Sequence, residues 1–77
     1  MKTTDNIKVE YIMEIYNGEN YICNFTTEYP KEMRKEIAQS RLLDKALTYT
    51  PTYKFFKKIY KDGVCSEWYR IDENAIT

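Results

Sequence analysis

The sequence lacks histidine altogether and has only two glycines, two prolines and two cysteines among its 77 residues. Without histidine, the chain has neither the commonest general base nor the commonest metal ligand, and no Ser-His or Cys-His nucleophile can form. Two glycines are too few for a phosphate-binding loop, because both are needed in turns. A chain this short cannot hold a doubly wound nucleotide-binding sheet or a barrel enzyme. We therefore expect no enzyme, no cofactor and no metal site.

The two cysteines, Cys23 and Cys65, lie 42 positions apart and match no metal-binding spacing. Residues 1–6 lack the apolar region of a signal peptide, and no apolar run has membrane-spanning length. We therefore expect a cytoplasmic protein with no membrane contact and with free thiols. Neither cysteine is predicted at a helix N-terminus, where its pKa would fall, so both are interpreted as small core residues.

Apolar and polar residues alternate over residues 7–16, and a second apolar segment covers residues 21–25. Such alternation is typical of half-buried strands, and Asn17-Gly18 between them is a turn signal. A three-residue loop ending at Gly18 is predicted, because it places the odd-numbered residues of both strands on one face. A two-residue loop of Asn17 and Gly18 would instead set Phe25 beside Glu10.

Residues 53–60 and 64–71 form a similar pair of segments around Lys61-Asp62-Gly63. The same three-residue loop is predicted, and one face of the hairpin is then apolar except for one pair of opposite charge. The predicted pairs are Tyr53–Ile71, Phe55–Tyr69, Lys57–Glu67 and Ile59–Cys65. A two-residue Asp62-Gly63 turn is the alternative, and it would mix the two faces.

A helix is predicted over residues 27–48, with Thr26 or Thr27 as its cap, Pro30 in its first turn and Pro51 beyond its end. The helical period gathers a core stripe of Tyr29, Met33, Ile37, Ser40, Leu43 and Leu47. A second stripe of Ala38, Leu42, Ala46 and Tyr49 lies on the opposite side. This second stripe is a candidate interface for a homodimer, or it lies beneath the C-terminal tail.

These elements predict a single α+β domain over residues 1–77, with the order β-β-α-β-β and frayed ends at 1–5 and 73–77. The sheet is predicted to be mainly antiparallel in the strand order 2-1-3-4, with the helix on one face. Cys23 and Cys65 then lie on opposite edges, about three strand spacings of ~4.8 Å apart. That separation excludes a disulfide within one chain.

The sheet face away from the helix carries the clearest functional signal. It combines aromatic and basic side chains, namely Phe56, Tyr60, Trp68, Lys54, Lys58 and Arg70. The formal net charge of zero hides an asymmetry, since residues 48–71 carry five basic and two acidic residues. Residues 1–30, in contrast, carry two basic and five acidic residues.

We therefore expect a non-enzymatic binding protein that regulates or inhibits a protein partner through this face, because aromatic and arginine side chains dominate protein interfaces. The alternative function is a nucleic-acid-binding module, in which bases stack on the same rings. A structural alternative places Trp68 in the core. The small size and the tyrosine-rich and lysine-rich composition are typical of small phage or mobile-element proteins, an association that carries no mechanism.

Overall fold

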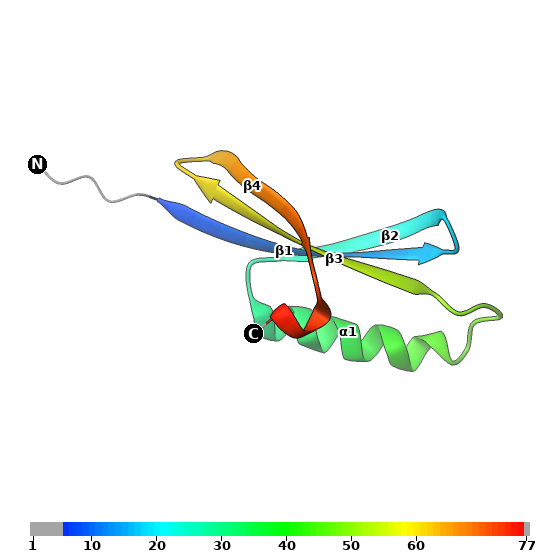
Figure 1. Ribbon diagram of the computed structural model, residues 1–77. Helices are drawn as coiled ribbons and strands as arrows, with labels where there is room; N and C mark the ends of the chain where they lie inside the picture. The colour runs from blue at the N-terminus through cyan, green and yellow to red at the C-terminus, as the bar shows by residue number, and fades with distance from the viewer. Residues whose placement is uncertain (1–5, 77) are drawn as a thin grey trace, which may run out of the picture.

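The computed structural model describes residues 6–76 of the chain. In order, the elements are β1 (Ile7–Asn17), β2 (Asn20–Thr27), α1 (Pro30–Asp44), β3 (Thr52–Lys61), β4 (Val64–Ile71) and the short 3₁₀ helix η1 (Glu73–Ala75). The four strands form one antiparallel sheet in the order β2-β1-β3-β4 (Figure 1). The predicted α+β fold and strand order are confirmed. The fraying expected for residues 1–5 and 77 lies outside the described residues.

Both hairpin turns have two residues in the loop, so the predicted three-residue loops are wrong. Asn17 pairs with Asn20 around Gly18, which has a φ of 62°. Lys61 pairs with Val64 around Asp62 and Gly63, whose φ values are 53° and 84°. Positive φ at both central residues makes the Asp62-Gly63 turn type I′, which follows the natural twist of paired strands. In the Gly18-Glu19 turn only Gly18 has a positive φ.

A bulge in each edge strand restores the predicted faces beyond these shorter turns. One residue lies unpaired between two ladder pairs on each edge, Ile22 in β2 and Ser66 in β4. The Ser66 hydroxyl donates a hydrogen bond of 3.2 Å to the Ile59 carbonyl. A two-residue loop alone would turn the predicted residues of each edge strand to the wrong face of the sheet. Each bulge adds one residue to the edge strand and so returns the residues beyond it to the predicted face.

The predicted pairs of the second hairpin are nevertheless displaced by two residues along the ladder. Phe55 lies opposite Ile71, and Ile59 lies opposite Glu67. The predicted Lys57–Glu67 charge pair is therefore absent, because Tyr69 lies opposite Lys57. On the turn side of each bulge the faces are exchanged, and Tyr21 and Cys65 lie opposite Tyr16 and Tyr60.

Helix α1 is shorter at both ends than the sequence predicts. The Thr27 hydroxyl accepts a hydrogen bond from the Tyr29 amide at 3.1 Å and donates one to Glu32 at 2.8 Å. Thr27 thus supports the helix start, although Tyr29 is the N-cap residue. At the other end the helix stops at Asp44, whose carboxylate accepts a 2.6 Å hydrogen bond from the Tyr53 hydroxyl.

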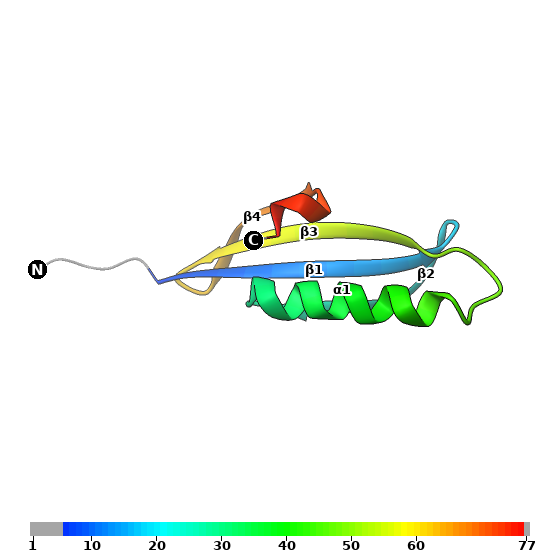
Figure 2. The same cartoon turned by 90° about the horizontal axis from the view of Figure 1, so that it is seen from below.

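The core lies between the sheet and α1. Met13 on β1 and Met33 on α1 are fully buried, and Tyr11, Ile37 and Phe55 pack with them. The views in Figures 1 and 2 agree that α1 lies on one side of the sheet, along β1 and β2. No described helix covers the opposite side. We call that uncovered side, which carries the even-numbered residues of β1 and β3, the open face.

The C-terminal segment completes the core, in contrast to the fraying expected for residues 73–76. Figure 1 shows η1 on the same side of the sheet as α1, and Figure 2 shows it beside α1, towards β3. Ile76 is only 3% exposed within the core. Arg34 donates a hydrogen bond of 3.0 Å to the Ile76 carbonyl, and Arg41 binds Glu73 through both guanidinium nitrogens. The tail therefore fills the space under the sheet that one helix leaves empty.

The predicted core stripe of α1 is correct only in its middle. Met33, Ile37 and Ser40 are buried as expected. Tyr29, Leu43 and Leu47 are exposed, and Leu47 lies beyond the helix end. The stripe fails at both ends because Tyr29 precedes α1 and Leu47 follows it, while Leu43 in the last turn is left uncovered.

Both cysteines are free, on opposite edge strands, as the strand order requires. The expectation that they are core residues is wrong, because Cys23 and Cys65 are exposed. Each edge strand has only one neighbour in the sheet, so one side of each cysteine is left open to solvent.

Replacing Gly63 by valine is expected to cost about 1 kcal/mol of folding stability or more, because a β-branched residue is strained at a φ of 84°. Nothing lies within 4 Å of the added Cβ, so the cost is conformational rather than steric. Glu19→Val is the control, because residue 19 also lies in a turn but has no positive φ. Denaturant melts of the two variants provide the comparison. Equal stability of the two variants would contradict the turn assignment.

The Tyr53–Asp44 contact predicts a loss of stability at high pH. Burial, followed by the hydrogen bond to Asp44, raises the pKa of Tyr53 to about 12 from the ordinary tyrosine value of 10.0. The unfolded chain loses this proton near pH 10, whereas the folded chain keeps it until about pH 12. The stabilisation is therefore complete below pH 10 and is lost between pH 10 and 12.

Tyr53→Phe is the matched variant, since it removes only the hydroxyl. We expect the parent to be more stable than Tyr53→Phe at neutral pH by about 1 kcal/mol. The difference should shrink above pH 10 in urea melts recorded at a series of pH values. A difference that stays constant to pH 12 would rule out the coupling.

Candidate binding face

All six residues predicted for partner binding lie together on the open face. Phe56 on β3 lies opposite Arg70 on β4, and Lys58 lies opposite Trp68. Lys54 and Tyr60 are on the same side of β3, because alternate residues of a strand share a face. The structure thus brings two short rows of aromatic and basic side chains side by side, although the pairs differ from those predicted.

Trp68 is the most prominent of these side chains. It is 60% exposed, and the Lys58 ammonium lies 4.4 Å from the centroid of its ring. This cation–π contact holds the ring and the lysine in one geometry on the surface. The structural alternative, in which Trp68 belongs to the core, is wrong.

The centre of the open face is less exposed than the sequence suggests. Ile12 on β1 is only 8% exposed, although no helix covers it. Its cross-strand neighbours are Phe56 on one side and Thr26 on the other. Phe56 and Tyr60 are themselves half-buried. On β3 and β4 the exposed apolar surface of this face is therefore concentrated at Trp68, while Tyr21, opposite Tyr16, is exposed at the β2 edge.

The β1 half of the open face carries acidic side chains that are already engaged. The Lys8 ammonium lies 3.5 Å from Glu10 and 3.7 Å from Glu28, and these carboxylates, Glu28 first, raise the pKa of Lys8. The Tyr16 hydroxyl donates a 2.6 Å hydrogen bond to Glu14, which raises the pKa of Tyr16.

Lys54 is likewise occupied within the open face. Its ammonium lies 4.3 Å from the centroid of the Tyr16 ring, so it bridges β3 and β1. The basic side chains of β3 thus lie over aromatic rings, and they separate the acidic β1 half from Trp68 and Arg70.

Three exposed apolar residues near the turns were not among the predicted binding residues. They are Tyr21, Ile22 and Val64, and they lie beside the two bulges. Their exposure follows from the positions of the bulges. The sequence indicates a bulge only indirectly, because a two-residue turn without one would not keep the apolar residues of both strands on the same face.

The second predicted interface is not a continuous surface. Ala38 and Leu42 are on α1, but Ala46 and Tyr49 lie beyond its end at Asp44. Ala38 lines a hollow together with Arg34, Arg41 and Glu73, so the C-terminal segment lies next to part of this stripe. Leu42 remains 66% exposed.

No known family model matches the chain, and neither the curated proteins nor the solved structures compared with it include a match. Among the described residues, no cluster of three or more cysteine or acidic side chains could hold a metal ion. None of the described helices is long and apolar enough to cross a membrane.

The different burial of Trp68 and Phe56 predicts different costs of truncation. Trp68→Ala should cost less than about 1 kcal/mol, because most of the ring is already in water. Phe56→Ala should cost about 2 kcal/mol or more, since it uncovers Ile12.

Denaturant melts followed by far-UV circular dichroism measure both costs without relying on tryptophan emission. If Trp68→Ala unfolds the domain while Phe56→Ala leaves it intact, the assignment of the two side chains is reversed.

Proposed function

We propose that this protein is a non-enzymatic binding module that regulates or inhibits a protein partner. The partner binds to the open face and covers it. The observation that carries the proposal is the exposed Trp68 ring, held by Lys58 on a sheet face that no described helix covers. A large ring with a flanking cation is the combination that dominates protein interfaces. Arg70, on the same strand, adds a bidentate donor for a partner's carboxylates.

The distribution of charge suggests which part of a partner approaches this site. Lys58 and Arg70 flank Trp68, whereas the carboxylates of Glu10 and Glu14 belong to the β1 half. A partner with an apolar pocket for the tryptophan ring and an acidic rim fits the β3–β4 half.

A nucleic-acid partner fits this surface less well. Lys58 and Lys54 lie over the rings of Trp68 and Tyr16 and compete with bases for the stacking surfaces. Glu10 and Glu14 on the same sheet face repel phosphates. Function through a nucleic acid requires both lysines to move away from the rings.

Affinity capture with three forms of the chain tests the proposal. Trp68→Ala removes the ring from the open face. Tyr69→Ala is the matched control, because Tyr69 is the next residue of β4, is 43% exposed and faces the other side of the sheet. We expect a protein captured by the parent and by Tyr69→Ala to be lost with Trp68→Ala.

With the captured protein purified, Trp68→Ala should weaken binding about tenfold or more, as truncation of an interface hot spot does. Lys58→Glu should mainly slow association with an acidic partner. Unchanged affinity of Trp68→Ala would contradict the proposal. Tight, steeply salt-dependent binding of single-stranded RNA or DNA by the parent would favour the nucleic-acid alternative.

A further inference from the structure

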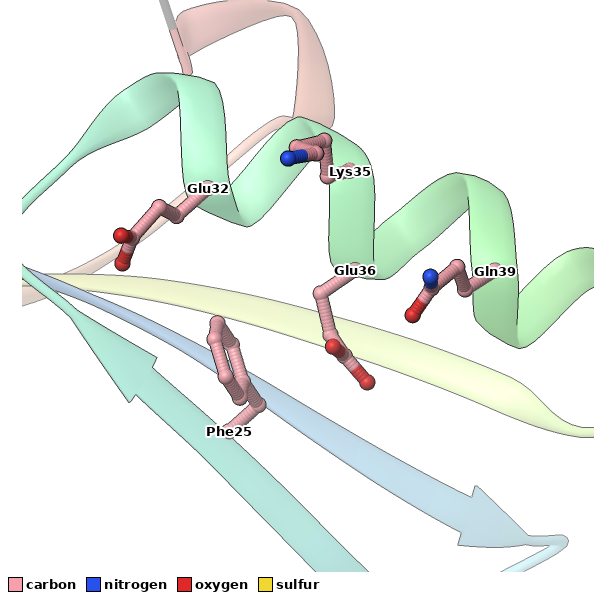
Figure 3. A pocket seen from close by; sticks show the side chains of 5 residues that line it. All are labelled: Phe25, Glu32, Lys35, Glu36 and Gln39. Atoms are coloured by element: carbon pink, nitrogen blue, oxygen red, sulfur yellow. The ribbon is translucent and has the colours of Figure 1, made fainter.

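A groove runs between strand β2 and helix α1, on the opposite side of the sheet from the open face. Figure 3 shows one part of it, where the Phe25 ring of β2 lies below Glu32, Glu36 and Gln39 of α1. A second hollow continues towards the C-terminal end of α1 and is lined by Ile22, Cys23, Leu43 and Leu47. Glu36 lines both hollows, so they form one groove, with Glu32, Lys35 and Glu36 in its charged part and Leu43 and Leu47 in its apolar part.

Strand β2 forms the outer wall of this groove and is an edge strand with little protection. Its sequence, NYICNFTT, contains no charged residue, no proline and no glycine. Edge strands usually carry charges, prolines or bulges that prevent pairing with another chain. The bulge at Ile22 protects only the turn end, while residues 23–27 pair regularly with β1. The other edge strand, β4, carries Glu67 and Arg70.

Two features of the α1 wall indicate the chemistry of an occupant. Glu36 is half-buried in the groove, and its carboxylate makes no hydrogen bond or ion pair with any described residue. Leu43 is 71% exposed and Leu47 is 42% exposed, although both have the helical spacing of core residues. A basic side chain of an occupant would form an ion pair with Glu36, and an apolar side chain would cover Leu43.

We propose that this groove binds an extended basic and apolar peptide segment of a partner protein, which adds to β2 as a fifth strand of the sheet. Backbone hydrogen bonds to β2 supply affinity, and alternate side chains directed towards α1 supply specificity. An apolar residue enters the hollow beside Leu43, and a lysine or arginine on the same face of the peptide reaches Glu36. This site is separate from the open face and does not depend on it.

A synthetic probe provides the first test. The probe is a fluorescein-labelled ten-residue peptide of threonines in which three positions, each two residues apart, are replaced by leucine, leucine and lysine. These three side chains share one face when the peptide is extended. Fluorescence anisotropy should show this peptide binding to the full chain, and replacing the lysine by glutamate should weaken binding about tenfold. A peptide that is N-methylated along the β2-facing edge should not bind, because it cannot complete the ladder.

Charge reversal in the protein provides the second test. Glu36→Lys should lose affinity for the lysine peptide about tenfold and gain affinity for the glutamate peptide. Glu67→Lys is the matched control with the same charge change on the exposed β4 strand, and it should bind as the parent does. Trp68→Ala should also bind the peptide unchanged, which separates this site from the open face.

The proposal is overturned if the folded parent does not bind the lysine peptide at protein concentrations up to roughly 1 mM. It is also overturned if backbone N-methylation leaves the affinity unchanged. A dimer in light scattering that the peptide does not dissociate, and that Glu36→Lys does not alter, would identify a second copy as the occupant of β2.

Discussion

One helix of 15 residues has to cover a sheet of four strands, and this constraint determines which surfaces of the protein are available. The contact between Met13 and Met33, both fully buried, fixes α1 along the β1–β2 half. The β3 side then needs another cover, and Ile76 supplies it from the C-terminal end of the chain. No described element remains for the open face, so its side chains have to cover one another.

This self-covering explains why the open face is not a uniform apolar patch. Phe56 and Thr26 bury Ile12 from the two sides, while lysine stems and aromatic rings share the rest of the surface. Trp68 lies nearer the β4 edge, where neighbours on one side are missing, and it remains exposed. The position of each side chain in the sheet therefore decides its exposure: Ile12 on the central strand β1 is buried, and Trp68 on the edge strand β4 is exposed.

Much of this fold is predictable from the sequence because strand alternation is a strong constraint. The faces of Phe56, Lys58 and Trp68 depend only on parity, and parity is correct even though the loops and pairs are wrong. The errors arise where two rules compete. A type I′ turn at Asp62-Gly63 is locally favourable, and a bulge at Ser66 resolves its conflict with the apolar face.

Other features depend on tertiary contacts that no periodicity contains. The buried position of Ile76 requires a gap beside α1, and the hydrogen bond between Tyr53 and Asp44 joins the end of α1 to β3. The groove between β2 and α1 likewise depends on where the helix lies across the sheet. Leu43 has the spacing of a core residue, and only the placement of the helix makes it a groove residue.

The binding role proposed for the open face requires Trp68 to be exposed in the folded chain, and collisional quenching of its emission measures that exposure. The chain has a single tryptophan, so the fluorescence signal has one source. We expect iodide and acrylamide to quench the emission of the native protein almost as efficiently as that of the urea-unfolded chain, with iodide favoured by the adjacent Lys58. Native emission that is strongly protected from both quenchers in a monomer would show instead that Trp68 is packed.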